Sequence, residues 1–387
     1  MDNIDGMNDA GAGQSGHPEG GGDTGDKKIK PGRVDGKNVY WRNGKIRIPK
    51  RLRNEILTTI QVNRSKAAHK EKSVGYSTQA KREQVVLDFF MALIYLGYKI
   101  ESVHSLKQKH LVAVFNFLEI AGEDKRGQAP STIQNKISIM RTFCGWIGKA
   151  GMVGDSYKYV RDKTSVRRTN VVQDDLSWVG NRVDVQEIVA KIREMGDERV
   201  AVWVEQCWVF GIRIQESVLM RPGIGDKGEA LYVREGTKGG RDRHVPIKTP
   251  EQRAVLEKAK ALMDKKTGFL GKRGKTPEQN YQHFRDFMRK KMGITKADKG
   301  VTCHGLRHQY AQEQHKDLAG VDAPIKGGDI SVVTPDEYNS VTRTLMEHLG
   351  HSRVSIGSAY YGSRRRKSRK ATEHAPAEDS IEPQKEN

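Results

Sequence analysis

The chain has 387 residues, more than a single hydrophobic core usually serves, so we expect two domains plus tails. Lys and Arg number 68 against 48 Asp and Glu, which gives a formal net charge of +20 and indicates a large polyanionic partner. The sequence holds no apolar run near the ~18–20 residues that a membrane span requires and no signal peptide, so we expect a cytoplasmic protein with no membrane partner.

The N-terminal segment divides into two parts of different composition. Residues 1–35 are rich in Gly and Asp and poor in large apolar side chains, so they cannot bury enough surface to offset the entropy of ordering, and we predict a disordered tail. Residues 36–73 form a basic extension in which Asn43-Gly44 is typical of a two-residue hairpin turn. This extension is either an accessory arm that contacts the polyanion or a segment packed on the next domain.

Three helices are expected after this extension. Apolar residues recur at three- and four-residue steps over about 77–97, 107–121 and 131–147, which is the period of a helix with one buried face. The third stretch opens with STIQ at 131–134, a capping-box pattern. Together the three stretches predict a compact helical domain at 74–168.

The second predicted domain, 175–362, changes its hydrophobic period. Residues 231–234 and 243–247 alternate between apolar and polar side chains and predict two strands joined by a Gly- and Lys-rich turn. Helical segments surround them, so the expected fold class is mainly α with a small β-sheet. Residues 320–340, rich in Gly, Pro and Asp, predict an inserted loop that is either an inter-subunit contact or a surface excursion. Residues 363–387 form a basic and then polar tail, either a solvated end or a non-specific contact for the polyanion.

The three cysteines, Cys144, Cys207 and Cys303, lie far apart in apolar or helical contexts. They form no CxxC pair, and no His cluster has the spacing of zinc ligands. We therefore expect buried structural thiols, and neither a metal site nor a cofactor.

Five short segments of the second domain stand in a fixed order: GIRIQE at 211–216, TKGG at 237–240, HGLRH at 304–308, LGH at 349–351 and YY at 360–361. This order and spacing resemble the catalytic signature of the tyrosine site-specific recombinases of the phage-integrase type. The resemblance covers about 74–362 and implies a helical core-binding domain followed by a tyrosine-recombinase catalytic domain. The distance from Arg307 to His351 is longer than is usual in that family, because of the inserted loop.

The resemblance implies that Tyr360 attacks a DNA phosphodiester and forms a 3′-phosphotyrosyl intermediate. A tyrosine ester preserves the energy of the cut bond, because the phenol is a good leaving group in the return reaction. Spacing from the LGH motif favours Tyr360 as the nucleophile, with Tyr361 as the alternative. Arg213 and Arg307 each offer a planar fork of N–H donors for the negative charge that builds on the phosphate.

The same resemblance assigns supporting roles to four further residues. Lys238, in the predicted hairpin turn, acts as the general acid for the leaving 5′-oxygen. His304 assists proton transfer at the tyrosine hydroxyl, and His351 donates a hydrogen bond to the phosphate. Glu216 orients Arg213 without touching DNA.

The implied partner is double-stranded DNA with specific recombination sites, bound by a homotetramer, with accessory DNA-bending or directionality proteins possible and a place on the nucleoid. The implied task is integration or excision of a mobile element. Two alternatives stay open: nicking and religation like that of a type IB topoisomerase, and a non-catalytic DNA-binding regulator.

Overall fold

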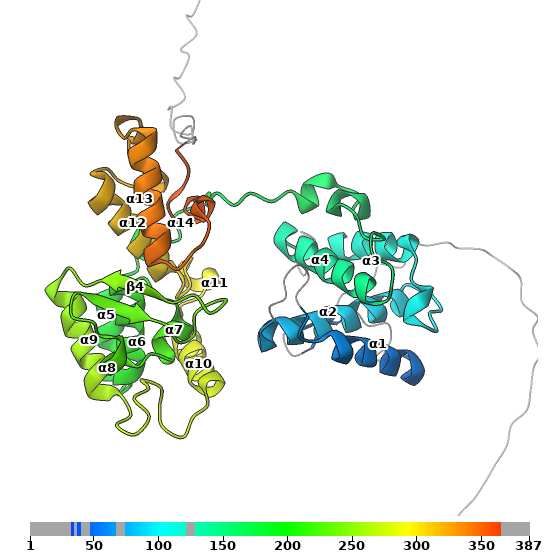
Figure 1. The fold of residues 1–387 in the computed structure, drawn as a ribbon, viewed down its shortest axis with the longest axis horizontal. Coiled ribbons are helices and arrows are strands. Elements are labelled where there is room, and N and C mark those ends of the chain that lie inside the picture. Colours follow the sequence, from blue (N-terminus) through cyan, green and yellow to red (C-terminus); the bar gives the residue numbers. More distant parts are fainter. Residues whose placement is uncertain (1–31, 35–36, 40–46, 67–73, 121–127, 365–387) are drawn as a thin grey trace, which may run out of the picture. The chain divides into compact units, whose positions relative to one another are not determined.

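The chain divides into two units, Met1–Arg167 and Arg168–Asn387, and each has its own apolar core (Figure 1). The computed structural model describes residues 32–34, 37–39, 47–66, 74–120 and 128–364. Helices dominate both units, and the described strands form two separate two-stranded antiparallel ribbons. The predicted fold class, mainly α with a small β-sheet, is confirmed.

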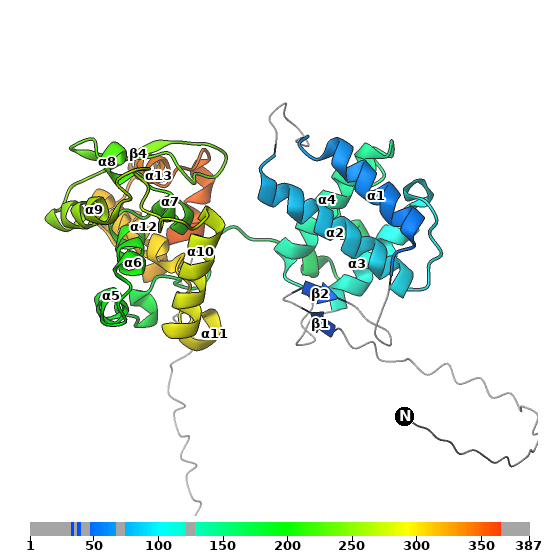
Figure 2. The ribbon, with the colours of Figure 1, turned by 90° about the horizontal axis from the view of Figure 1, so that it is seen from below.

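In the described residues of the first unit, the α-helices pack around one core, as Figure 2 shows. Its elements are β1 (Gly32–Val34), β2 (Lys37–Val39), α1 (Lys50–Asn63), α2 (Tyr76–Tyr95), η1 (Val103–Ser105), α3 (Gln108–Ile120), α4 (Pro130–Trp146), η2 (Ser156–Tyr159) and η3 (Lys163–Val166). Each helix contributes fully buried side chains to that core, among them Ile56, Phe90, Phe115 and Phe143. α1 therefore packs into the same core as the three helices that the sequence predicted.

The start of α4 differs from the prediction. The helix begins at Pro130 with Ala129 as its N-cap residue, and no side chain caps it. The capping box predicted from Ser131 is wrong, because the fixed φ of proline suits the first helical position, and the N-cap lies two residues earlier, at Ala129. The turn predicted at Asn43-Gly44 lies outside the described residues, as does the predicted tail of 1–35 apart from residues 32–34.

The second unit places the segments of the predicted site around two central helices, α6 and α12, which contact each other (Figures 1 and 2). Its elements are η4 (Val179–Asn181), α5 (Val185–Glu194), α6 (Glu198–Val209), α7 (Ile214–Val218), α8 (Pro222–Gly225), β3 (Ala230–Val233), β4 (Arg243–Pro246), α9 (Pro250–Leu262), α10 (Pro277–Asp286), the π-helical turn η5 (Phe287–Lys291), α11 (Lys296–Lys299), α12 (Gly305–Ala319), η6 (Pro324–Lys326), η7 (Ile330–Val332), α13 (Pro335–His348), η8 (Val354–Ile356) and α14 (Ser358–Tyr361).

α6 is apolar on nearly every face and is buried from Val200 to Cys207, as expected for a helix that crosses the middle of a domain. It ends at Val209 with Phe210 as its C-cap residue, so the GIRIQE motif begins directly after this helix. The predicted strands are also found: β3 and β4 pair antiparallel, with Leu231 opposite Val245. The turn between them carries the predicted lysine.

The connector between α12 and α13 is shorter than the predicted loop of 320–340. α13 begins at Pro335, because Thr334 and Glu337 form a reciprocal capping box. The last six residues of the predicted loop are therefore helical, and the two single turns η6 and η7 occupy part of the remainder. The tail at 363–387 lies outside the described residues beyond Arg364. Within the described ranges, no helix combines the length and apolarity that crossing a lipid bilayer requires.

Candidate functional site

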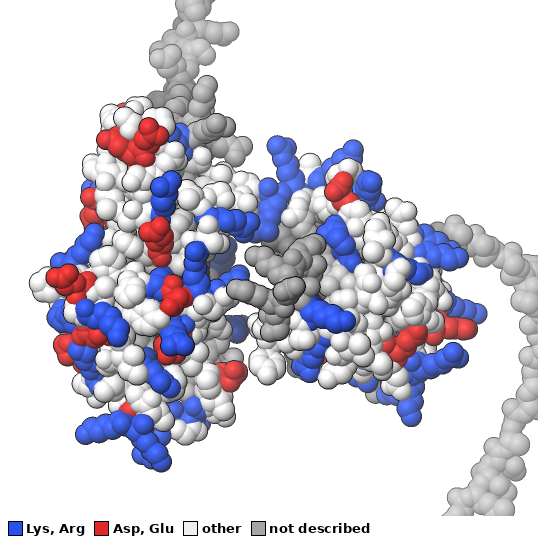
Figure 3. Space-filling view, in the orientation of Figure 1, with Lys and Arg blue, Asp and Glu red and all other residues white. Residues whose placement is uncertain are grey.

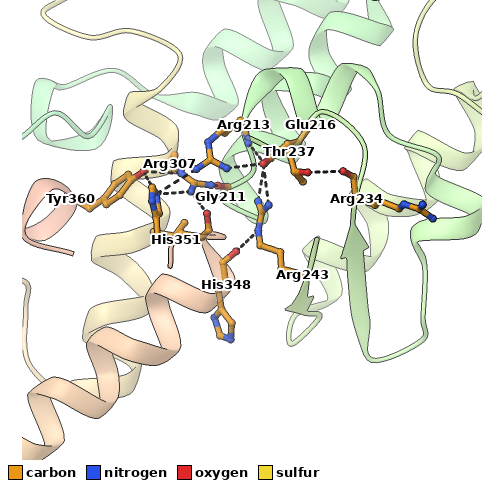
Figure 4. A network of polar contacts seen from close by, with 11 residues as sticks. Gly211, Arg213, Glu216, Arg234, Thr237, Arg243, Arg307, His348, His351 and Tyr360 are labelled. Atoms are coloured by element: carbon orange, nitrogen blue, oxygen red, sulfur yellow. Dashed lines mark hydrogen bonds and ion pairs between the residues drawn. The ribbon is translucent and has the colours of Figure 1, made fainter. Parts of the chain in front are cut away.

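Four of the predicted side chains meet around one hydroxyl group (Figure 4). The Nε of Arg307 donates to the hydroxyl of Tyr360 at 3.1 Å, and Nε2 of His351 lies 2.9 Å from the same hydroxyl. Nη2 of Arg213 and Nη2 of Arg307 lie 3.4 and 3.2 Å from that imidazole nitrogen. Residues that are as far apart as 213 and 360 in the sequence thus form one contiguous polar cluster.

Arg307 is held almost rigidly near the start of α12. The residue is 1% exposed, its Nη1 donates to the carbonyl of Gly211 at 2.6 Å, and its Nη2 donates to the carbonyl of Leu349. Burial lowers the pKa of the guanidinium to about 10, so the group stays positively charged near neutral pH. The two carbonyls aim its remaining N–H groups toward Tyr360 and His351.

Arg213 lies at the N-cap of α7 in an extended conformation. Its Nη1 donates to Oε1 of Glu216 and its backbone N–H donates to Oε2, both at 2.7 Å. The expected pairing of the two residues is therefore present, but it is a capping-box contact. The Arg213 side chain remains 19% exposed, so it is reachable from solvent.

The carboxylate of Glu216 is buried and carries a full negative charge near neutral pH. Its burial opposes ionisation, but the hydrogen bond from Arg243 and the charges of Arg243, Arg213 and Arg307 together lower the pKa to about 2. A buried charge is tolerated only when it is paired and hydrogen-bonded in this way.

Arg243 is the residue of the cluster that sequence reasoning missed. Its Nη1 and Nη2 donate to the two carboxylate oxygens of Glu216 at 3.0 and 2.7 Å, and its Nε donates to the carbonyl of His348 at 2.6 Å. The alternation of the strand could have indicated it, because Arg243 lies on the same inward face of β4 as the buried Val245. A charged side chain on an inward face requires a buried partner.

Lys238 is exposed in the turn between β3 and β4. It lies close enough for its positive charge to contribute to the lowered pKa of His351. Gly239 and Gly240, which the sequence singled out, both have positive φ, and so does Gly236. A side chain at Gly236 would clash with the backbone of Gln215, at 2.5 Å from its carbonyl oxygen, so this third glycine lets the turn lie directly on α7.

The two predicted histidines are held in their neutral forms. Burial of His351, together with the charges of Arg307 and Arg213, lowers its pKa to about 4. Crowding by surrounding protein and the positive charge nearby lower the pKa of His304 to about 3, although more than a third of this residue is exposed to solvent. The ring of His304 lies 6.0 Å from that of Tyr360, centroid to centroid.

The neutral state of His351 predicts a pH effect on stability. An unfolded histidine takes up a proton near pH ~6.5, whereas His351 in the fold resists protonation down to about pH 4. The free energy of unfolding therefore decreases as the pH falls from 6.5 toward 4. In thermal unfolding of the full chain without DNA, His351→Gln should lose less melting temperature between pH 7 and pH 5 than the parent protein. The exposed His244→Gln variant is the matched control, and an equal loss in all three proteins would contradict the prediction.

The adjacent tyrosines of α14 point in different directions. The hydroxyl of Tyr360 faces the arginines, whereas Tyr361 is fully buried and its ring packs 5.0 Å from that of His315 and 6.5 Å from that of Tyr338. Burial raises the pKa of the Tyr361 hydroxyl well above its ordinary value. Of the two hydroxyls, the one on Tyr360 is in contact with both Arg307 and His351.

Side chains of α12 and a backbone amide at the start of the unit contact the backbone of α14. Nδ1 of His308 and Nε2 of Gln312 lie 3.4 and 3.3 Å from the carbonyl oxygen of Tyr360, and Gln312 also donates to Asp175 at 2.9 Å. The amide of Val172 donates to the carbonyl of Ser358 at 3.0 Å. His308, which had no assigned role, therefore contacts the main chain of the tyrosine.

A pocket of about 820 Å³ borders the cluster, with Arg213 and His304 in its lining. Further cations line it, among them Arg285, Arg289 and Lys290. Such a lining suits a phosphate backbone. Among the described residues, no group of three His, Cys, Asp or Glu side chains could hold a metal ion. Cys144 and Cys207 are buried, and Cys303 is partly buried.

Comparison with known proteins identifies the relatives of this arrangement. Residues 181–313 match the sequence family described as Integrase. No curated protein sequence matches the chain. The structure of a lambda integrase dimer bound to a COC′ core site is similar at a TM-score of 0.51 and 14% identity, over 82% of this chain and 79% of that one. At that identity the likeness shows the fold.

Two further solved structures are similar at lower scores. XerH site-specific recombinase bound to palindromic difH substrate matches at a TM-score of 0.49 and 13% identity, over 74% of this chain and 76% of that one. The Tn1549 transposon integrase in complex with transposon right end DNA matches at a TM-score of 0.47 and 13% identity, over 80% of this chain and 94% of that one.

Proposed function

We propose that this chain is a tyrosine-type site-specific recombinase that cuts and rejoins DNA through a phosphotyrosine at Tyr360, since residues 181–313 match the Integrase family. One observation carries the assignment: the hydroxyl of Tyr360 contacts both Arg307 and His351, and Arg213 lies beside them. A non-catalytic DNA-binding regulator would have no need for this convergence.

The chemistry starts with attack of the Tyr360 oxygen on a phosphorus atom in the DNA backbone. Negative charge then builds on the non-bridging oxygens, and preorganised cations stabilise it more strongly than water does. Arg213 and Arg307, which both lie beside His351, supply that charge. The product is a tyrosyl ester, so the free 5′-hydroxyl of another strand can attack it and reseal the DNA.

Two protons must move in the first step. Both His304 and His351 are neutral, so either ring can accept the proton of the Tyr360 hydroxyl. The direct contact at 2.9 Å gives this position to His351 before DNA binds, whereas the family resemblance assigns it to His304. Lys238 is the proposed general acid for the leaving 5′-oxygen, because its turn is seated against α7 beside Arg213.

The proposed partner is double-stranded DNA that carries specific recombination sites. Lysine and arginine side chains are spread over the face shown in Figure 3, and the net charge of +20 favours phosphate neutralisation as the main source of affinity. Exchange between two duplexes requires four strand cuts with one nucleophile each, so we propose a homotetramer on DNA. Accessory DNA-bending or directionality proteins, and a mobile element as the DNA that is moved, complete the proposal.

The test is recovery of covalent protein–DNA adducts from cells that express the chain, followed by sequencing of the attached ends. A recombinase gives ends that cluster at one sequence and carry the protein on the 3′-phosphate. Ends scattered over many sequences would favour the topoisomerase alternative, and DNA that is bound but never attached would favour the regulator.

A further inference from the structure

Arg243 joins separate parts of the proposed site, as Figure 4 shows. It lies at the start of β4, in the hairpin that carries Lys238. Its two terminal nitrogens bind the carboxylate of Glu216, and its Nε binds the last helical carbonyl of α13, that of His348. The Arg243 side chain is 5% exposed.

We propose that Arg243 is a positioning residue, which keeps Arg213 available to the scissile phosphate by occupying both oxygens of Glu216. This inference rests on the proposed function of the site. It concerns the cleavage step and not the affinity for DNA, since Arg243 is buried away from solvent.

The argument begins with the four donors around one carboxylate. Oε1 of Glu216 receives Nη1 of Arg213 at 2.7 Å and Nη1 of Arg243 at 3.0 Å. Oε2 receives the backbone N–H of Arg213 and Nη2 of Arg243, both at 2.7 Å. One terminal nitrogen of Arg213 therefore binds the carboxylate, and the other, Nη2, faces His351.

Removal of Arg243 would change this arrangement in two ways that act in the same direction. Each oxygen of Glu216 would keep one donor from Arg213 and lose one. Arginine and carboxylate prefer two parallel hydrogen bonds, so the under-satisfied carboxylate would draw the second terminal nitrogen of Arg213 away from the phosphate position. The charge balance also changes, because one carboxylate would then offset the whole charge of Arg213. Both effects weaken the stabilisation of the negative charge that builds during cleavage.

The second contact of Arg243 fixes the turn that delivers His351. Gly350 has φ of +68°, and a Cβ there would lie 3.1 Å from Cδ and Nη1 of Arg243. The arginine therefore fills the space beside the LGH motif, which explains why this position carries no side chain. Through the His348 carbonyl and this packing, one side chain sets the spacing between α7, β4 and the end of α13.

The experiment measures single-turnover formation of the covalent adduct at saturating protein, on a synthetic nicked duplex that carries the site recovered from cells. Arg243→Gln should slow the adduct step by about 10- to 100-fold, by analogy with the loss of residues that orient metal ligands. It should leave the dissociation constant for the duplex unchanged. Arg243→Lys, which keeps the charge but cannot bind both oxygens and the His348 carbonyl together, should recover part of the rate. Arg253→Gln is the matched control, because Arg253 pairs with Asp226 at 2.7 Å at the edge of the same unit.

A substrate with a methylphosphonate at the scissile position separates positioning from a general structural role. The methyl group removes one negative oxygen, so the reaction depends less on the charge of Arg213. The defect of Arg243→Gln should shrink on this substrate, and adding Glu216→Gln should likewise restore part of the rate on ordinary DNA. A purely structural role would give the same defect on both substrates.

Each outcome bears on the inference separately from the proposed function. If the parent protein forms the adduct and folded Arg243→Gln forms it equally fast, the positioning role is wrong and the recombinase assignment stands. A defect of equal size on ordinary and methylphosphonate DNA also overturns the role, and the Arg243→Lys variant supplies the same comparison if Arg243→Gln does not fold. If the parent protein forms no adduct, both proposals fall.

Discussion

Tyr360→Phe is expected to abolish covalent attachment to DNA and to leave site binding intact. The change removes one oxygen atom and no ring surface, so the packing of α14 is preserved. The hydroxyl makes two hydrogen bonds, to Arg307 and His351, and each contributes about 0.5–1.5 kcal/mol net, which a folded domain tolerates. The measurement is denaturing electrophoresis of the protein after incubation with a nicked suicide duplex, alongside a mobility-shift titration of the same duplex.

Tyr361→Phe is the matched control for this experiment. The residue is adjacent in the chain, equally aromatic and fully buried, but it packs against His315 and Tyr338. Its variant should form the adduct at a rate close to that of the parent protein. An adduct in Tyr360→Phe, or its loss in folded Tyr361→Phe, would transfer the nucleophile assignment to Tyr361.

The choice between these two tyrosines shows where sequence reasoning stops. Spacing from the LGH motif already favoured Tyr360, because a family signature preserves the register of α14 relative to His351. The directions of the two side chains depend on α12, whose His308 and Gln312 hold the Tyr360 carbonyl. No local pattern near residue 360 contains that information.

The fold was predictable where local chemistry dictates it. Helical periodicity located α2, α3 and α4, and strand alternation located β3 and β4, because these patterns follow directly from one buried face. Helix starts were less predictable: Pro130 and Pro335 each begin a helix at a point that side-chain periodicity does not mark.

The site was predictable as a set of residues but not as a network. The charged pair of Glu216 and Arg243 is separated by 27 positions, and its existence depends on how the hairpin folds over α7. The sequence indicates that Arg243 lies on the inward face of its strand and that Glu216 follows Arg213, but it does not indicate that Arg243 and Glu216 form a pair. Only the packing of Gly236 on the backbone of α7 brings the two together.

Arg307→Lys is expected to produce the second-largest loss of activity, by at least about 10²–10³-fold in the rate of adduct formation, the range for loss of a single charge-stabilising donor. The positive charge remains, so the effect tests geometry. One ammonium group cannot reproduce the three contacts of the guanidinium with Gly211, Leu349 and Tyr360. The hydroxyl of Tyr360 would lose the donor that orients it, and the phosphate would lose one planar fork.

The same substitution should also destabilise the second unit, and the two effects are measured separately. The carbonyls of Gly211 and Leu349 both bind the buried Arg307 side chain, and a buried carbonyl left without a donor costs about 1–3 kcal/mol. Thermal unfolding therefore gives the structural loss, and adduct formation is then compared at a temperature where both proteins are folded. If folded Arg307→Lys forms the adduct within about tenfold of the parent rate, less than the loss of one such donor causes, the guanidinium geometry is not what stabilises the phosphate. A positive charge at position 307 would then be sufficient for that role, whatever its geometry.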